Sequence, residues 1–321
     1  MNSGGFEVGS RKRLRSTWHR RWSPAIEEAV RAIPDTQLCP HDLYLTLLQM
    51  NISQGGRVAV VTGEDAPAAV VGLRREGRLR WRNLTSWILP GFVGAVSDEM
   101  VLPALASLNT EIALPWWRLS VKPEHPSIRT LREAPVNRVD LDKAEAYWRS
   151  SKMWATITRA RRKCEGLEVH VDAPGDAEWI IRSEARKWNP ERFETDVTVE
   201  AKVEIARQLA EAGRYVTVTL RDGDQRLAGV TTLIDGSTAV SGILYRDESV
   251  GSLPTGVRVL DEIFTLSRER GLVDLDLGYS YPYKNQWAPQ DGTVYDVIVS
   301  PPLHDLTHRA IDRLRRPASR E

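Results

Sequence analysis

Residues 251–287 constrain the fold of this chain more than any other segment. They read GSLPTGVRVLDEIFTLSRERGLVDLDLGYSYPYKNQW. Apolar side chains recur at helical spacing over 255–270, which predicts an amphipathic helix that ends at Gly271. The apolar run 272–277 predicts a short buried strand, and a tyrosine-rich loop with one lysine follows it. We therefore expect an α/β fold in which this helix leads directly into a buried strand.

The length and composition indicate a globular protein with room for two domains. The chain has 321 residues, of which 41% are hydrophobic and 27% are charged. Its net charge of +1 gives no overall electrostatic attraction to nucleic acid. Basic residues nevertheless gather at 11–21 and at 159–163. These runs are either solvated surfaces or surfaces that attract a phosphate-bearing ligand.

Several kinds of site are not indicated by the sequence. Cys39 and Cys164 lie far apart and match no metal or redox spacing, which is typical of reduced structural thiols in a cytoplasmic protein. His304 and His308 are four residues apart without a third ligand, which favours a solvated helix face. No apolar run of membrane-spanning length and no signal peptide is visible. We expect a cytoplasmic protein with no metal and no membrane contact.

Helices and strands are expected in a similar order in the two halves of the chain, after a poorly ordered start over 1–20. In the first half, the expected helices start at Ser23-Pro24, span 41–49 and lie near 98–108, and the expected strands span 57–62, 67–73 and 78–84. In the second half, the expected helices span 140–148, 152–165 (capped by Ser150-Ser151), 176–188 and a segment capped by Thr198, and the expected strands span 214–220, 226–234, 238–244, 272–277 and 293–300.

A weak internal repeat supports this parallel. Gly55-Gly56-Arg57 and Gly213-Arg214 each follow a predicted helix and open an apolar strand. Each strand then leads through a turn containing Asp and Gly into a second, alanine-containing strand. Two copies of one α/β unit packed together are predicted. The joint between them is expected near 123–137, which holds three prolines.

The start of the helix over 255–270 is a candidate phosphate-binding site. Thr255, Gly256 and Val257 occupy its first turn, where unpaired backbone N–H groups and the positive end of the helix dipole favour an anion. Gly256 would let a pyrophosphate approach closely, and Pro254 pre-sets the turn. The alternative is that Pro-Thr-Gly only starts the helix, because Pro and Gly are common at such positions.

Two motifs carry a family resemblance. Leu-Pro-Thr-Gly at 253–256, and Asp-Leu-Asp-Leu-Gly at 274–278 followed by Tyr283 and Lys284, resemble GNAT-type acyltransferases of the CelD/BcsL-like, FemAB-related kind. The resemblance is good over 140–300 and only architectural elsewhere. It implies tandem GNAT-like domains, each a mixed, mostly antiparallel sheet flanked by helices. The implied parts are a flexible basic N-terminus (1–22), a degenerate GNAT-like domain (23–135), an acyl-donor-binding GNAT domain (136–305) and a basic C-terminal tail (306–321).

The resemblance also implies a reaction. An N-acyltransferase would move an acyl group from acyl-CoA to an amine of a small molecule or sugar by direct attack of the acceptor. The first alternative is a FemAB-like transferase that uses aminoacyl-tRNA, which the two basic runs favour and the near-zero net charge disfavours. The second alternative is a catalytically inactive GNAT-like binding module, because Leu-Pro-Thr-Gly departs from the Ser-Pro-Gly-like element usual in the family.

The same resemblance implies roles for particular residues. The catalytic candidates are Asp276, Tyr283 and Lys284; the donor-binding candidates are Pro254, Thr255, Gly256, Val257 and Arg258; the substrate-binding candidates are Arg159, Lys187, Trp188, Tyr245 and Tyr281. Glu184 shares a predicted helix with two of the last group. Asp276 would act as the base and a tyrosine would return a proton to the departing thiolate. Structural alternatives are that Asp276 caps a turn or that Lys284 keeps it ionised. A pantetheine arm is expected in a gap between strands near 240–245 and 272–277.

Overall fold

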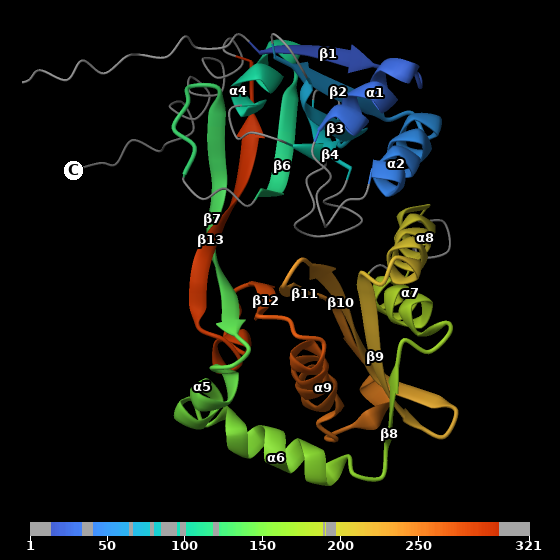
Figure 1. Ribbon diagram of the computed structural model, residues 1–321, viewed down its shortest axis with the longest axis vertical. Coiled ribbons are helices and arrows are strands. Elements are labelled where there is room, and N and C mark those ends of the chain that lie inside the picture. Colours follow the sequence, from blue (N-terminus) through green and yellow to red (C-terminus); the bar gives the residue numbers. More distant parts are fainter. Residues whose placement is uncertain are drawn as a thin grey trace, which may run out of the picture.

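The computed structural model of the protein describes residues 14–33, 41–63, 67–77, 80–84, 95–96, 101–117, 122–188, 190 and 197–301. Within them, one sheet of 13 strands runs through the whole molecule, with helices packed on its faces (Figure 1). The strands follow one another across the sheet in the order β1-β2-β3-β4-β6-β13-β7-β12-β11-β10-β9-β8, and β5 pairs with β3 beside this path.

The first half of the molecule comprises the elements up to β6. They are β1 (Arg15–His19), α1 (Pro24–Ala32), α2 (His41–Ser53), β2 (Arg57–Thr62), β3 (Pro67–Arg75), β4 (Arg80–Asn83), β5 (Ala95–Val96), α4 (Val101–Leu105), the 3₁₀ helix η1 (Ala106–Leu108) and β6 (Glu111–Trp117). The predicted helices at Ser23-Pro24 and 41–49 and the predicted strand over 57–62 are confirmed.

The second half comprises the elements from α5 to η4. They are α5 (Ala144–Ser150), α6 (Met153–Lys163), β8 (Glu168–Val171), α7 (Asp176–Trp188), α8 (Val197–Glu211), β9 (Tyr215–Asp222), β10 (Gln225–Asp235), β11 (Thr238–Arg246), η3 (Glu248–Val250), α9 (Thr255–Glu269), β12 (Asp274–Tyr279) and η4 (Lys284–Gln286). The β9–β10 and β10–β11 hairpins turn at Gly223 and Gly236, whose positive φ angles suit glycine. The predicted hairpins are therefore confirmed.

Two long strands, β7 (Ile128–Asp140) and β13 (Gln290–Val299), join the halves at the centre of the sheet (Figure 1). β13 pairs with β6 on one side and with β7 on the other, and β7 pairs in turn with β12. The C-terminal strand therefore extends the sheet of the first half. The proline-containing segment expected as a joint becomes a strand from Ile128 onward, and the predicted domain boundary at 135/136 falls inside it.

The sheet is mixed but mostly antiparallel, as predicted. Among the strand pairs of the described residues, β4–β6 and β11–β12 are parallel and all the others are antiparallel. Each parallel pair is connected by a helix, α4 in the first half and α9 in the second, because parallel neighbours need a crossover connection. The two halves thus repeat one α/β plan.

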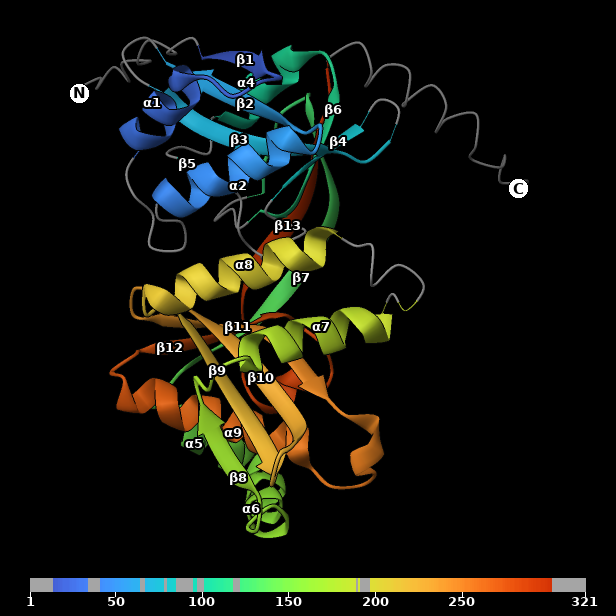
Figure 2. The same cartoon turned by 90° about the vertical axis from the view of Figure 1, so that its right-hand side faces the viewer.

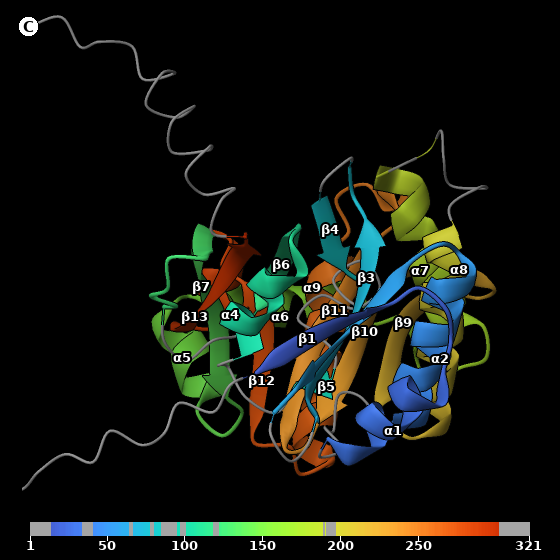
Figure 3. The same cartoon turned by 90° about the horizontal axis from the view of Figure 1, so that it is seen from above.

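The two halves also share a hydrophobic core. One cluster of buried side chains includes Ile26 and Leu48 of the first half together with Ile205 and Leu209 of α8. Helix α8 lies between the rest of the second half and α2 (Figure 2). Seen from above, α1, α2, α7 and α8 gather on one side of the molecule and α5 lies on the other (Figure 3). Burial across this contact fixes the halves relative to each other.

Several local predictions were wrong. Residues 15–19, expected within a flexible basic segment, form β1 and pair with β2, and Trp18 packs 5.5 Å from Trp81 between ring centroids. The residue that caps α6 is Lys152, which has a φ of 65° and makes no side-chain cap hydrogen bond. Ser151, the expected cap, instead donates to the Gln286 carbonyl oxygen at 2.9 Å. Thr198 lies inside α8, which begins at Val197.

Other predictions fall on residues outside the described part of the chain. These are the segment 1–13, Cys39, His304, His308 and the basic tail over 306–321. Cys164 is buried and has a free thiol, whose pKa is raised by burial. Among the described helices, none combines the length and the apolar character needed to cross a membrane.

Candidate functional site

The parallel strands β11 and β12 separate part-way along their length. They pair only over Thr238–Val240 and Asp274–Asp276. Beyond this point β11 continues to Arg246 and β12 to Tyr279 without pairing to each other. The expected gap between these strands is therefore present. It leaves backbone groups of both strands without a neighbouring strand.

A β-bulge helps to bend β11 at this fork. The β10–β11 register shifts between Val230 and Thr232, and the Ile243 amide donates to the Thr231 Oγ1 at 2.8 Å. Gly242 is required here, because a Cβ at this position would lie 2.5 Å from the same hydroxyl oxygen. A bulge increases the local twist and bends the strand that carries it. The bulge accordingly lies at the residues where β11 has left β12.

Side chains satisfy part of the freed edge of β12. The Lys284 Nζ donates to the Leu277 carbonyl oxygen at 2.5 Å, and the Gly278 amide donates to the Asp276 Oδ1 at 2.6 Å. Asp276 is 3% exposed. Two of the predicted catalytic residues therefore hold the strand end in its separated position.

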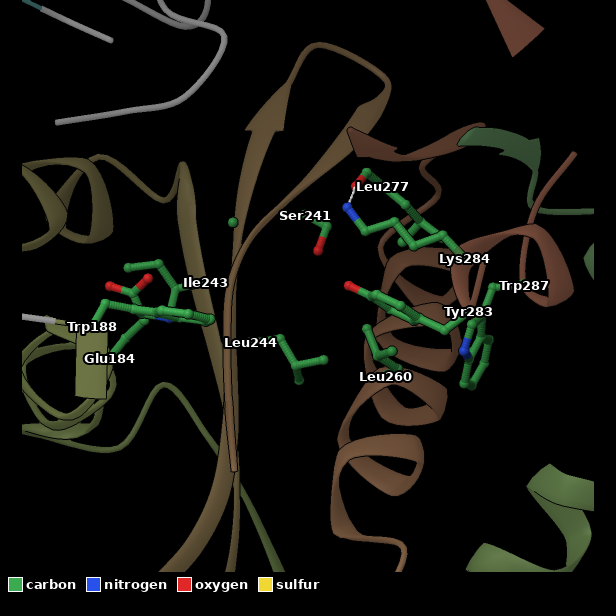
Figure 4. Close-up of a pocket in the computed structure, with 11 residues that line it drawn as sticks. Glu184, Trp188, Ser241, Ile243, Leu244, Leu260, Leu277, Tyr283, Lys284 and Trp287 are labelled. Carbon is green, nitrogen blue, oxygen red and sulfur yellow. Dashed lines mark hydrogen bonds between the residues drawn. The ribbon is translucent and has the colours of Figure 1, made fainter. Parts of the chain in front are cut away.

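A cavity of about 230 Å³ occupies the fork. Its walls come from α7, β11, α9, β12 and the segment around η4, and the lining residues are Glu184, Trp188, Ser241, Gly242, Ile243, Leu244, Leu260, Leu277, Tyr283, Lys284 and Trp287. Figure 4 shows Glu184, Trp188 and Ile243 on one side of β11 and Tyr283, Lys284 and Leu260 on the other. The wall at Trp287 is rigid, since its ring stacks on Phe264 at 5.4 Å and its carbonyl accepts from the Trp148 Nε1 at 2.9 Å. The cavity thus reaches from one face of the sheet to the other.

Lys284 is the most perturbed cation of this cavity. Burial lowers the pKa of its amine from 10.5 to about 8, and the nearby Asp276 carboxylate opposes this shift. The Nζ atom also lies 5.2 Å from the Tyr281 ring centroid and 5.9 Å from that of Tyr283. The amine is therefore mostly charged at pH 7 and becomes neutral as the pH rises through about 8.

Tyr283 brings a phenol group to the same wall. Its hydroxyl points toward β11 (Figure 4), and burial followed by the neighbouring Tyr281 raises its pKa. The two rings are stacked with their centroids 6.3 Å apart. Tyr283 consequently stays protonated and can donate a proton into the cavity.

The first turn of α9 has the features predicted for an anion site, except that Arg258 is paired with acidic residues of the same helix. Pro254 is the N-cap residue, no side chain caps the helix, and no acidic residue lies in its first turn. Thr255 is fully buried and its Oγ1 has no hydrogen-bond partner within the described structure. A Cβ on Gly256 would meet only the Arg246 Cδ, at 4.0 Å. Arg258, predicted to bind the donor, instead pairs with Glu262 and with Asp261 at 3.4 Å, further along the helix.

The other predicted residues are dispersed. Trp188 lines the cavity and is 74% exposed, whereas Lys187 pairs with Glu248 at 2.8 Å. Tyr245 packs edge-on against Trp179 with the ring centroids 5.3 Å apart. Arg159 is exposed on α6 and does not line the cavity. The structure therefore brings together Trp188, Tyr283 and Lys284, and leaves Asp276 behind the cavity wall.

Sequence reasoning did not identify Ser241 or Leu260 as lining residues. Ser241 lies in a strand whose alternation predicts burial but not the position of the fork. Leu260 belongs to the apolar stripe of α9, which any packed helix of this kind would have. Among the described residues, no group of three or more His, Cys, Asp or Glu side chains is placed to hold a metal ion.

A comparison with known protein families finds a match in the second half of the chain. Residues 151–285 match the family model for the acetyltransferase (GNAT) domain. This range contains the whole cavity except Trp287, and it includes the fork and the start of α9. No curated protein sequence matches the chain.

Solved structures share the fold at low sequence identity. The C-terminal domain of a protein assigned as a lysylphosphatidylglycerol synthetase from Agrobacterium fabrum is 14% identical, with a TM-score of 0.51 over 91% of this chain and 96% of that chain. L-PGS from Bacillus licheniformis is 14% identical, with a TM-score of 0.48 over 91% and 97% of the two chains. FemX is 13% identical, with a TM-score of 0.49 over 90% and 99%. Residues 151–285 thus form a GNAT-like acyltransferase domain, and the fold shared with the Agrobacterium fabrum protein covers 91% of the chain.

Proposed function

We propose that the protein is an N-acyltransferase that moves an acyl group from acyl-CoA to an amine of a small molecule or sugar. The fork between β11 and β12 carries this proposal, because it combines a cavity with strand edges that no longer pair with each other, and an extended amide-containing arm would bond to such edges. The start of α9, which follows β11 and η3 in the chain, would supply the second part of the donor site. No side chain caps it, and the amides of Gly256 and Val257 with the Thr255 hydroxyl would bind the diphosphate of the donor, whereas the Thr255 amide donates to the Leu253 carbonyl oxygen at 2.9 Å.

The reaction would proceed by direct attack in this cavity. The acceptor nitrogen forms a bond to the thioester carbonyl carbon, the carbon–sulfur bond breaks, and the thiolate leaves. Tyr283 would supply the proton that the thiolate takes up, and its phenolate would recover a proton from the nitrogen of the new amide bond. Lys284 would contact the reacting carbonyl. Asp276 would be a positioning residue: it accepts a hydrogen bond from the Gly278 amide, and its charge acts on the nearby Lys284 amine.

A thiol-release assay tests this function. Purified protein is incubated with a panel of acyl-CoAs and a mixture of amine acceptors, and native mass spectrometry checks for a complex with acetyl-CoA. We expect a bound donor and acceptor-dependent release of free thiol. Donor binding without release, for every acceptor and acyl group tried, would leave the protein as an inactive binding module. Absence of both would exclude the proposal.

One observation favours a second candidate, an aminoacyl-tRNA-dependent transferase. Four exposed cations at and along α6 have no ion-pair partner within the described residues: Lys152, Arg159, Arg162 and Lys163. Such a surface suits a phosphate backbone. If this candidate is correct, tRNA binds with an affinity that falls steeply with salt, and alanine at these four positions abolishes the binding. Weak binding that the four substitutions leave unchanged argues against it.

A further inference from the structure

Helix α7 contributes a carboxylate and an indole ring to the cavity wall. Glu184 and Trp188 are four residues apart on α7, so they lie on the same face of the helix, and both line the cavity. Figure 4 shows them together with Ile243 on one side of β11, across the strand from Lys284 and Tyr283. A carboxylate and a large aromatic ring therefore share one wall, apart from the groups assigned to the donor.

The Glu184 carboxylate is unpaired within the part of the chain that the structure describes. Cations close to it on α7 are engaged with other carboxylates: Arg182 bonds to Glu178 at 2.7 Å, and Lys187 bonds to Glu248 at 2.8 Å. Glu184 is itself partly buried. A carboxylate partly removed from water and without a partner favours a cationic ligand.

Trp188 adds a second feature that favours the same ligand. Its side chain is 74% exposed, whereas large aromatic side chains normally bury most of their surface. The indole face is the strongest of the aromatic faces in attracting cations, and it also covers the apolar part of a bound ring or alkyl group. An exposed indole beside a free carboxylate thus combines two ways of holding an organic ammonium group.

We propose that Glu184 and Trp188 form the acceptor subsite and that it selects a positively charged amine attached to a ring or an alkyl chain. This inference rests on the proposed function, which leaves the nature of the acceptor open. The ammonium group lies against the Glu184 carboxylate, which takes up one of its protons before the neutral nitrogen attacks the thioester, and the carbon skeleton packs on Trp188 and Ile243. Neutral hydroxyl acceptors of the same shape bind more weakly, because they leave the carboxylate without a cation.

Binding measurements without a donor test this subsite. Isothermal titration compares two matched pairs, glucosamine with glucose and cyclohexylamine with cyclohexanol. We expect at least one amine to bind about tenfold or more tightly than its hydroxyl counterpart. Glu184→Gln should weaken that amine about 10- to 100-fold, and Trp188→Ala should weaken it further than Trp188→Phe does.

Glu178→Gln is the matched control, because it removes the same charge from the same helix outside the cavity. If both Glu→Gln changes weaken the amine equally, or if no amine binds better than its alcohol, the subsite is excluded. If the wild-type protein binds the amine in a Glu184-dependent way but does not bind acetyl-CoA, only the proposal that acyl-CoA is the donor is overturned. The two proposals therefore fail in distinguishable ways.

Discussion

The two parallel strand pairs follow the same plan, and within the described residues the second pair opens onto a cavity. In the first half, β4 ends at Asn83, directly after its pairing with β6 over Arg80–Arg82. In the second half, β11 continues to Arg246 after its pairing with β12 has ended at Val240. Extra strand length beyond the last paired residue is what creates a fork.

The helices that connect the two strands of each parallel pair, α4 and α9, also differ. Helix α4 spans Val101–Leu105, and the buried side chains of α4 and η1, including Leu102 and Leu108, join one cluster with residues of β6 and β13. Helix α9 spans Thr255–Glu269 and also packs buried side chains into one cluster, but its Leu260 in addition lines the cavity that Lys284 enters from η4. A repeated topology therefore does not imply a repeated function. The first half uses this position for packing, and the second half uses it for a cavity.

The largest effect is expected from breaking the core that unites the halves. Leu48 is fully buried in the cluster that contains side chains of both halves. Leu48→Ala should lower the free energy of unfolding by about 2–5 kcal/mol, since it removes buried methyl groups and leaves a cavity. Chemical denaturation followed by circular dichroism and by tryptophan fluorescence should give coincident transitions. Separate transitions for the two signals would mean that the halves unfold independently.

The control for this variant is Leu131→Ala. Leu131 is 54% exposed, so its replacement should change the free energy of unfolding little.

The second-largest effect is expected on the rate of acyl transfer when the Lys284 amine is removed. Lys284→Met removes the amine from the cavity, and the rate of acyl transfer should fall about a hundredfold or more. Lys284→Arg should not restore the rate, because a planar guanidinium fork cannot take the place of the compact amine beside the Leu277 carbonyl oxygen. Steady-state thiol release measures both variants. Lys143→Met, at an exposed lysine of the same half, should keep the full rate, and an equal loss there would contradict a specific role for Lys284.

The depressed pKa of Lys284 predicts a pH dependence of stability. The folded protein releases this proton near pH 8 and the unfolded chain near pH 10.5. Between these values the unfolded chain binds more protons, so the free energy of unfolding should rise with pH over this interval, and below about pH 8 the group adds no slope. Urea titrations of the wild type and of Lys284→Met across this range isolate the effect. Identical pH profiles for the two proteins would show that the amine is not perturbed.

The smallest effect is expected at the start of α9, where stability and binding should move in opposite directions. A Cβ on Gly256 would meet no atom closer than 4.0 Å, so Gly256→Ala should stabilise the protein by up to about 1 kcal/mol. The added methyl group would occupy the approach of a diphosphate, and affinity for acetyl-CoA should fall. Thermal unfolding and isothermal titration measure the two quantities. Unchanged affinity in the stabilised variant would remove this helix start from the donor site.

Local chemistry was sufficient to predict much of the second half. Helix α7 begins and ends at the predicted residues, 176 and 188, because its apolar positions recur at helical spacing. The hairpins at Gly223 and Gly236 follow from turn residues that tolerate positive φ. In the site, Tyr283, Lys284 and Trp188 were identified from the sequence and line one cavity.

Strands with little apolar alternation were missed. The N-terminal part of β7 is largely exposed, so nothing in its own composition marks it as a strand. β1 lies in a basic segment and is held by its pairing with β2 and by the contact of Trp18 with Trp81. Both strands owe their conformation to partners that are remote in the chain, and such partners do not appear in a local pattern.

The sequence by itself determined most of the helices, the hairpins of the second half with their turns, and the start of α9, because each depends on neighbours within a few residues. Only the tertiary structure decided where β11 leaves β12, that Asp276 supports the strand end without reaching the cavity, and that Glu184 has no partner among the residues that the structure describes. These features arise from the Thr231 bulge, the pairing of β12 with β7 and the packing of α7 beside β11. All of them are contacts between segments far apart in the chain, and their geometry is set by the sheet as a whole.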